Sequence, residues 1–285
     1  MKKIGVVIPV YNGETSIEKS IKSLLNQTFK DWIAIIINDG STDDTKEILK
    51  KFSYDYRFHI VHFEQNKGRP YARQKGLEIV KDLKLKYMCM LDADDWYYPN
   101  KLNCQFEILE NNNDLTLVSS AIGVTNRNNH LFKIIKPFTH FKKLYFQDFR
   151  HLVKLPHASS IIRVAHIDKN LSYDEKLKLS QDQDFLRRLL IHKNYAFDPK
   201  IQYIYNREES FSIQKYRRSM HFNFLSFKNL KLGKKANTIY HIKNNIKYRL
   251  VWVLNLVNLQ KIYLSNVGLN PTHSELIEFE ENQIN

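Results

Sequence analysis

The chain has 285 residues, of which 43% are hydrophobic, and it carries a formal net charge of +14. That length and apolar content suffice for one large α/β domain with an appendage, or for two domains, and they exclude a disordered or low-complexity chain. No segment approaches the ~20 apolar residues of a membrane-spanning helix.

The first half of the chain alternates between predicted strands and helices. Short apolar runs predict strands at Ile4–Val10, Trp32–Ile37, His59–Phe63, Tyr87–Leu91 and Thr116–Val124. Helices are expected from a capping box at Thr15–Glu18, from the turn at Asn38–Thr45 to about Phe52, over Tyr71–Leu83, and from Pro99 onward. This alternation predicts an α/β fold with a mostly parallel sheet and right-handed crossovers.

The second half is less regular. Asn126–Asn129 is typical of a hairpin turn, and His157–Arg163 and Ala196–Tyr205 are predicted strands. Ser180–Asp184 is expected to start a helix that runs over Phe185–His192.

Polar side chains follow each of the first four predicted strands. They are Pro9, Tyr11 and Glu14, then Asp39, then Asn66 and Arg69, and finally Asp92 and Asp94. Ligands of open α/β sheets bind beyond the carboxyl ends of the strands, so these residues are candidates for one site. Glycine-rich loops typical of dinucleotide-binding dehydrogenases or P-loop NTPases are missing from the sequence, which argues against both classes.

The acidic segment after the fourth strand is the strongest single feature. An apolar run ends in Asp92, Asp94 and Asp95. Carboxylates this close repel one another, and a hard divalent cation such as Mg²⁺ or Mn²⁺ would relieve the repulsion. The alternative is a solvated acidic turn that caps the next helix.

Together these segments resemble family 2 glycosyltransferases, which are inverting enzymes of GT-A fold. The matching segments lie in family order and are VVIPVYNGE at 6–14, INDGSTDDT at 37–45, NKGRPYARQKGL at 66–77, LDADDWYYPNKL at 91–102 and QDQDFLRRL at 181–189. A weaker match covers 203–212. The resemblance implies a Rossmann-like central sheet flanked by helices and a UDP-sugar donor.

The resemblance also implies roles for individual residues. Residues expected to bind the nucleotide sugar are Pro9, Tyr11, Glu14, Asp39, Asn66, Arg73, Asp92, Ala93 and Asp94. Among them, Tyr11 would pack on the base, Asp39 would accept a hydrogen bond from the base ring, and Asp94 would bind Mn²⁺ or Mg²⁺ with the diphosphate.

Asp182 matches the general base of the family. Gln181 stands where the family has a glutamate, and this departure puts the tuning of Asp182 in question. Asn206-Arg207 replaces a histidine that is frequent in the family, and Arg207 is a candidate diphosphate ligand.

Several alternatives compete with this interpretation. Taken alone, Asp182 would be a helix N-cap, Asp39 a turn residue and Tyr11 a packed aromatic residue. The competing functions are a sugar-nucleotide nucleotidyltransferase, which would need a glycine-rich triphosphate loop, and a peripheral membrane-binding protein with a degenerate GT-A domain.

The C-terminal region has a distinct composition. We expect a catalytic domain over 1–214 and a helical, basic and aromatic appendage over 215–285. Residues 210–274 contain eleven Lys/Arg and no Asp/Glu. Residues 215–265 are therefore expected either to bind an anionic membrane, which would suit a lipid-linked glycan acceptor, or to pack on the catalytic domain or a second subunit. No nucleic-acid recognition motif is present, so nucleic acid is not an expected partner.

The chain is expected to work in the cytoplasm, on the inner face of the membrane. Cys89 and Cys104 are expected to be small buried residues in a reducing compartment. The N-terminal apolar run is interrupted too soon by polar residues for a signal peptide.

Overall fold

The computed structural model describes residues 2–126, 128–146, 155–206, 213–229, 234–256 and 268–284. Its strands are β1 Ile4–Val10, β2 Trp32–Asn38, β3 Phe58–His62, β4 Tyr87–Met90, β5 Trp96–Tyr97, β6 Leu115–Thr125, β7 Leu131–Ile135, β8 Lys142–Tyr145, β9 Ile161–Arg163 and β10 Asn194–Asn206. Its helices are α1 Ile17–Leu25, α2 Thr45–Lys50, α3 Arg69–Asp82, α4 Lys101–Glu110, the short 3₁₀ helix η2 Val164–His166, α5 Gln181–Leu190, α6 Ile213–Asn229, α7 Lys234–Leu256 and α9 His273–Glu281.

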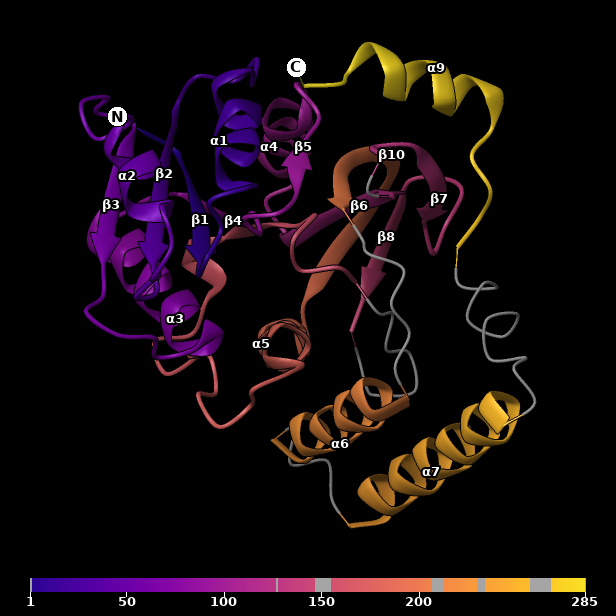
Figure 1. Ribbon diagram of the computed structural model, residues 1–285. Helices are drawn as coiled ribbons and strands as arrows, with labels where there is room; N and C mark the ends of the chain where they lie inside the picture. The colour runs from indigo at the N-terminus through magenta and orange to yellow at the C-terminus, as the bar shows by residue number, and fades with distance from the viewer. Residues whose placement is uncertain are drawn as a thin grey trace.

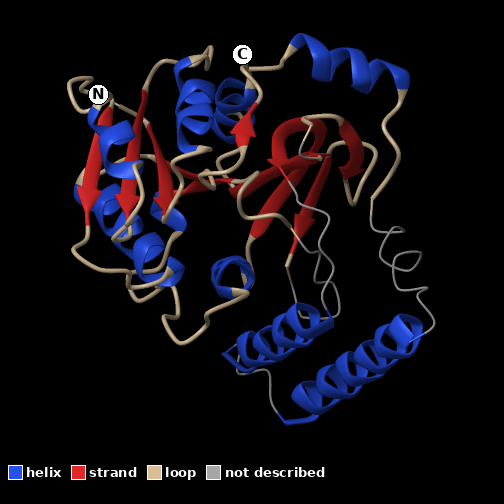
Figure 2. Ribbon diagram, in the orientation of Figure 1, coloured by secondary structure: helices blue, strands red, loops and turns tan. Residues whose placement is uncertain are grey.

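A ten-stranded sheet forms the centre of the molecule, in the order β3-β2-β1-β4-β9-β6-β10-β5, with β7 paired to β6 and β8 to β10 (Figures 1 and 2). Strands β1 to β4 are parallel to one another, as the sequence predicts. The side chains of β1, β2 and β4 are buried on both faces because helices cover both, which explains their continuous apolar runs, whereas the edge strand β3 is only partly buried. Helix α3 lies so close to β1 that a Cβ atom on Gly76 would come within 2.2 Å of a Val7 methyl group.

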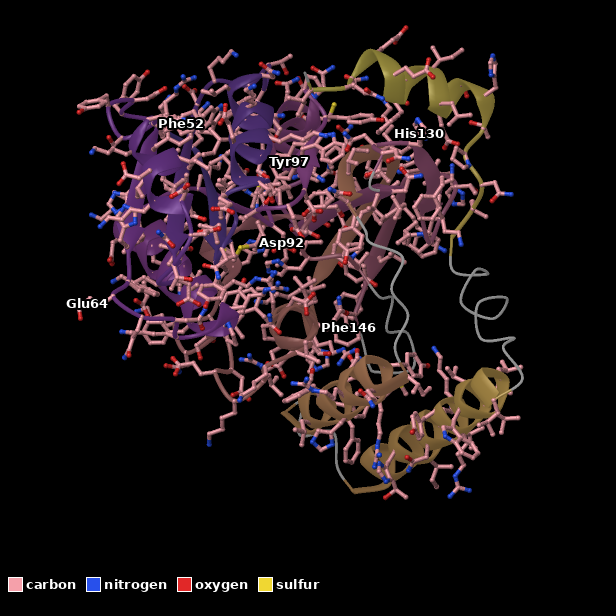
Figure 3. All side chains as sticks on the ribbon, viewed as in Figure 1. Phe52, Glu64, Asp92, Tyr97, His130 and Phe146 are labelled. Atoms are coloured by element: carbon pink, nitrogen blue, oxygen red, sulfur yellow. The ribbon has the colours of Figure 1, made fainter. Side chains whose placement is uncertain are left out.

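The second half of the sheet is mixed. Strand β9 is antiparallel to both β4 and β6, and β6 is parallel to β10. Strand β5, which the sequence analysis did not predict, follows the acidic segment and pairs antiparallel with β10. Asp92 and Tyr97 lie near the centre of the molecule (Figure 3).

Three local predictions are wrong. Helix α1 has Ser16 at its N-cap without a side-chain cap, so the expected capping box at Thr15–Glu18 does not form. Helix α4 begins at Lys101 after an Asn100 N-cap, because β5 occupies the residues between the acids and the helix. Only the last three residues of His157–Arg163 form a strand, since the amide of Ser160 bonds the carbonyl of His157 in a turn.

The C-terminal segments contact the rest of the chain at two places. Helix α6 packs on α5, where Arg187 donates to the Ser226 hydroxyl at 3.0 Å. Leu269 forms a β-bridge with Ile134 of β7, and Glu275 of α9 pairs with Lys136 at 2.7 Å. The domain boundary near residue 214 stays a prediction, although the last described segment lies against β7 rather than with α6 and α7. Among the described helices, none has the length and apolar character that a membrane crossing requires.

Candidate active site

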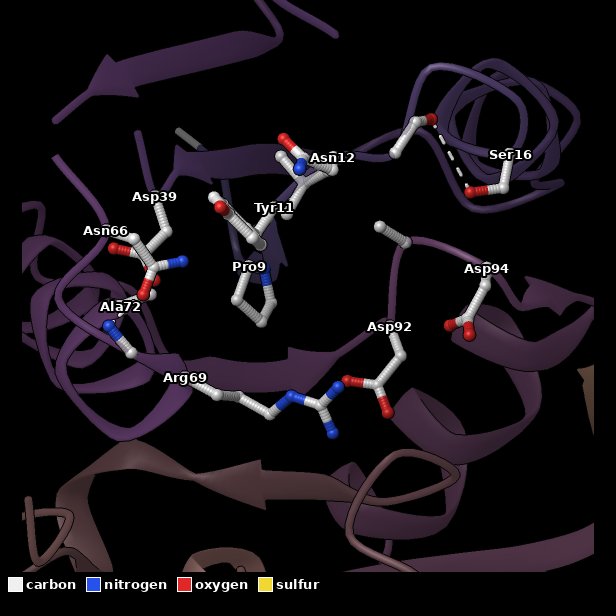
Figure 4. A pocket seen from close by; sticks show the side chains of 14 residues that line it. Pro9, Tyr11, Asn12, Ser16, Asp39, Asn66, Arg69, Ala72, Asp92 and Asp94 are labelled. Carbon is white, nitrogen blue, oxygen red and sulfur yellow. Dashed lines mark hydrogen bonds between the residues drawn. The ribbon is translucent and has the colours of Figure 1, made fainter. Parts of the chain in front are cut away.

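A cavity of about 340 Å³ opens at the carboxyl ends of the parallel strands. Its walls come from the ends of β1, β2 and β4, the start of α1 and the loop that leads into α3 (Figure 4). The lining residues are Pro9, Val10, Tyr11, Asn12, Gly13, Ser16, Asp39, Asn66, Gly68, Arg69, Ala72, Asp92, Ala93 and Asp94. The edge of the sheet that the sequence indicated is therefore the edge that carries a cavity.

Asp39 is fixed in this wall by the neighbouring loop. Its two carboxylate oxygens accept the backbone N–H groups of Lys67 at 2.8 Å and Gly68 at 2.9 Å. Gly68 has φ of +95°, a conformation that glycine adopts without strain. Asp39 is thus both a loop-organising residue and a lining residue, and each oxygen retains a lone pair for a ligand donor.

Asp92, in the floor of the cavity, forms a largely buried ion pair with Arg73 behind it. The Arg73 guanidinium donates to Asp92 Oδ1 at 2.9 Å, and the side chains are 4% and 24% exposed. Burial raises the pKa of Asp92, but the charges of Arg73 and Arg69 outweigh it and hold that pKa below the usual range. Arg73 does not line the cavity. Arg69, one turn earlier on α3, does, and its guanidinium points toward Asp92 (Figure 4).

The other two acids of the segment have different environments. Asp94 is exposed at the cavity, and partial burial together with the charge of Asp92 raises its pKa. Asp95 is 1% exposed, and it accepts hydrogen bonds from the Tyr203 hydroxyl and from the Asn206 amide. Asp95 therefore ties the end of β4 to the end of β10. These contacts rule out a simple solvated turn.

Asp182 reaches this region from a distant part of the sequence. It lies in the first turn of α5, whose N-cap is Ser180, so it is not the N-cap that its sequence alone suggested. Burial by itself would lower the pKa of Arg73, but the carboxylates of Asp92 and Asp182 raise it. Arg73 is thus close enough to interact with both acids. Asp182 is not among the residues that form the cavity wall.

A buried aromatic layer holds the start of α5 next to this ion pair. The Tyr173 ring stacks on Phe185 of α5 at a centroid distance of 4.2 Å, and its hydroxyl lies 2.9 Å from His157 Nε2. Burial and the charge of Arg73 lower the pKa of His157 to about 3, so the imidazole is neutral at physiological pH. The layer therefore contributes no positive charge beside Asp182.

The remaining predicted residues have three different outcomes. Pro9, Tyr11, Asn66 and Ala93 line the cavity, and Tyr11 is 49% exposed there, which excludes a packed core role. Glu14 lies outside the wall, because its carboxylate accepts the Asp44 amide at 2.9 Å and stabilises the turn before α2. Arg207 lies outside the described residues.

The donor set of the cavity suits a metal ion that is held mainly by its substrate. No cluster of three or more His, Cys, Asp or Glu side chains with metal-ligand geometry occurs in the part of the chain that the structure describes. Mg²⁺ and Mn²⁺ sites of phosphate-binding enzymes commonly use one or two carboxylates, and the phosphates supply further ligands. The exposed carboxylate of Asp94 fits that pattern, whereas Asp92 is already paired with Arg73.

Sequence reasoning missed two contributors to the site. Arg69 was recognised as a strand-end residue, but the nucleotide role went to Arg73, four residues later on the same helix. His157 was assigned to a strand, and nothing in its neighbours indicates that it meets Tyr173. The only local signal was that Arg69 precedes Pro70 at the start of a predicted helix, where a side chain faces the strand ends.

Comparisons with known proteins match the part of the chain that forms this cavity. Residues 5–171 match the family described as Glycosyl transferase family 2. Over 202 residues, 68% of this chain, the sequence is 37% identical to an uncharacterized glycosyltransferase of Methanocaldococcus jannaschii and spans 67% of that protein. The sequence is also 37% identical over 107 residues to TuaG of Bacillus subtilis, which is named as a candidate glycosyltransferase of teichuronic acid biosynthesis. That match covers 37% of this chain and 41% of TuaG.

Solved structures show the same fold. Residues 1–349 of S. aureus TarS, in crystal structures with UDP and with UDP-GlcNAc, superpose with TM-scores of 0.61 and 0.62 at 20% identity. The matches cover 82% of this chain and 68% and 69% of those chains. The chain spans at most 62% of the length of several other relatives.

Proposed function

Because the chain belongs to Glycosyl transferase family 2, we propose that it is an inverting, metal-assisted enzyme that moves a sugar from a UDP-sugar to a hydroxyl group of a saccharide acceptor. The product would be a cell-surface glycan such as lipooligosaccharide or capsule. TuaG is named for teichuronic acid biosynthesis, and TarS has been crystallised with UDP and UDP-GlcNAc, which supports both the donor and the product class.

The observation that carries this proposal is the convergence of acids from separate segments. Asp39 after β2 and Asp94 after β4 share one cavity, and the charge of Asp182 on α5 acts on Arg73, the partner of Asp92. A transferase needs one group for the base, one for the diphosphate and one for the acceptor hydroxyl. These residues supply the three groups.

Donor recognition would involve separate residues for the base and for the phosphates. The uracil ring carries an N–H donor, and the fixed Asp39 carboxylate is a suitable acceptor because its orientation is already set by Lys67 and Gly68. Tyr11, half exposed, offers a ring face for stacking on the base. Arg69 is the cation that faces the cavity and would contact a phosphate oxygen.

The diphosphate leaving group needs its developing negative charge stabilised. Mn²⁺ or Mg²⁺ would be held by Asp94 and would supply Lewis-acid stabilisation of that charge. Arg73, which does not line the cavity, keeps Asp92 ionised beside Asp94, and Asp92 contributes a negative charge to the cavity floor.

Asp182 is the proposed general base, which would accept the proton of the attacking hydroxyl and contribute ~10²–10⁴-fold to the rate. The other acid in the same turn, Asp184, is 0% exposed and is bonded to Arg188 Nε at 2.8 Å, so it is not available for proton transfer. Asp182 is half-buried and has no such intrahelical partner in the described hydrogen bonds. Gln181, which is buried, adds no second charge beside it.

The test is a donor-hydrolysis screen that measures UDP release from common UDP-sugars with Mn²⁺. We expect release from one or a few donors, loss of it in excess EDTA, and at least about 100-fold slower release or transfer in Asp94→Asn and Asp182→Asn. For Asp182→Asn, transfer to an acceptor should slow more than hydrolysis of the donor, because water can replace the acceptor in hydrolysis.

Asp31→Asn is the matched control. Asp31 precedes β2 and so lies at the opposite edge of the sheet from the cavity. Its substitution should leave UDP release unchanged. Full activity of the enzyme in excess EDTA would contradict the metal role, and the release of inorganic diphosphate instead of UDP would support a nucleotidyltransferase.

A further inference from the structure

Helix α7 presents a largely apolar face to solvent. Its large exposed apolar side chains are between 46% and 63% exposed and are Ile242, Ile246, Leu250, Trp252, Val253 and Leu256. Most recur at intervals of three or four residues, which places them on one side of the helix. Val251, on the opposite side, is completely buried. The exposed stripe is therefore an outward face of a helix that is already packed on its inner face.

Two basic residues belong to this face: Arg249 lies within the stripe, three residues after Ile246, and Lys243 lies at its edge. Lys243 and Arg249 are exposed next to the apolar side chains. No Asp or Glu occurs anywhere from residue 210 to residue 274. A protein interface between two copies of this basic helix would bring like charges together, whereas an anionic lipid surface would attract them. The charge distribution thus favours lipid over self-association.

Helix α7 is fixed to the catalytic part of the chain through α6. The Phe224 ring of α6 lies 4.4 Å from the His241 ring of α7, and Arg217 lies over Tyr248, a pattern typical of two antiparallel helices. Helix α6 is in turn held to α5 by Arg187, and Asp182 lies in the first turn of α5. Figure 1 shows this order of helices, with α7 outermost. A surface bound by α7 would therefore lie on the α5 side of the molecule.

We propose that the outward face of α7 docks in the interface of a lipid bilayer with anionic headgroups. The apolar stripe would enter the boundary between headgroups and acyl chains, and Lys243 and Arg249 would contact the headgroup phosphates. This binding goes beyond the glycosyltransferase chemistry and does not depend on it. Its consequence for that chemistry is that an acceptor embedded in the same bilayer would be presented near Asp182.

The test is sedimentation of the full chain with vesicles of phosphatidylcholine that contain phosphatidylglycerol, compared with phosphatidylcholine alone. We expect binding to the anionic vesicles that weakens as salt is added. The triple variant Ile242→Gln, Ile246→Gln, Leu250→Gln should bind on the order of 100-fold more weakly. The double variant Lys243→Gln, Arg249→Gln should bind roughly 25-fold more weakly to anionic vesicles.

Matched controls carry the same changes on α2 and the loop after it, on the far side of the molecule from α7 (Figure 1). Lys46→Gln with Lys50→Gln controls for charge, and Tyr54→Gln, at a residue 91% exposed, controls for exposed apolar surface. Circular dichroism should show all variants equally helical, and the α7 variants should still release UDP from the donor. Asp94→Asn should lose UDP release and keep vesicle binding, which separates the two proposals.

Two results would overturn the proposal. One is vesicle binding that is equal in the α7 variants and the controls. The other is a full chain that ignores vesicles but forms a dimer by analytical ultracentrifugation, with the dimer lost in the triple variant, since a second copy would then cover the face.

Discussion

Replacing Arg73 by methionine should destabilise the protein much more than the loss of an ordinary surface ion pair. Methionine retains an unbranched apolar stem in the buried site but removes the charge. Asp92, only 24% exposed, would then be a carboxylate without its nearest cation. Breaking a buried pair by removing one partner costs about 3–5 kcal/mol. Asp92 retains some contact with water, and Arg73 Nε has no hydrogen-bond partner in the described structure, so we expect about 3 kcal/mol.

The pH dependence of this loss follows from the pKa of Asp92. The pKa of Asp92 is lowered in the native protein, so ionised Asp92 stabilises the fold at any pH above its unfolded-state pKa of about 4. This stabilisation is lost as the pH falls through the lower pKa of the folded protein. Without Arg73, burial raises the pKa of Asp92, so ionised Asp92 becomes a penalty that protonation removes. The loss in unfolding free energy should be largest at neutral pH and smaller near pH 5.

Urea unfolding at pH 7 and pH 5 measures the effect, with Arg57→Met as the matched control. Arg57 bonds Asp55 at 2.6 Å, but both side chains are more than a fifth exposed, so its replacement should cost about 1 kcal/mol or less. The double variant Arg73→Met, Asp92→Asn should be less destabilised than the sum of the single variants. A loss that is additive, pH-independent or equal to that of Arg57→Met would refute the reasoning.

Three further outcomes follow from the site and its support. Partial burial raises the pKa of Asp94, so the affinity for Mn²⁺ in the presence of UDP should fall as the pH is lowered from 7 to 5. Calorimetry measures this affinity, and Asp94→Asn should remove its pH dependence. Tyr203→Phe deletes the hydroxyl that bonds buried Asp95 and should lower the unfolding free energy by about 1–3 kcal/mol in urea melts; an unchanged midpoint would contradict the tether between β4 and β10. Gly76→Ala should lower the melting temperature, because its Cβ would overlap Val7 and cost about 1–3 kcal/mol; a rise would mean that α3 shifts freely.

The position of the candidate site could be predicted from sequence because each parallel strand is recognisable from its own short segment. A strand buried on both faces needs an uninterrupted apolar run, so Ile4–Val10 and Tyr87–Met90 were recognisable without any partner. Where such a run ends in polar residues, the chain has reached the edge of the sheet. Asp39 and Asp94 were placed by that argument, and both line the cavity.

The sequence could not show in this way which site residues line the cavity and which are buried behind it. Arg69 and Arg73 lie one turn apart on α3, yet one lines the cavity and the other is buried against Asp92. Burial is decided by what packs across the helix, and here that includes His157 and Tyr173, which lie far away in the sequence.

The sequence by itself determined the parallel sheet, the edge that carries the acids and the basic, acid-free character of the C-terminal region. These are properties of short segments, set by the apolar period and by charge. Only the tertiary structure decided that β9 enters the sheet antiparallel to β4, that α5 brings Asp182 beside Arg73, and that α7 turns an apolar stripe outward. Each of those depends on contacts between residues distant in the chain, and a local pattern shows which face is apolar but not which partner covers it.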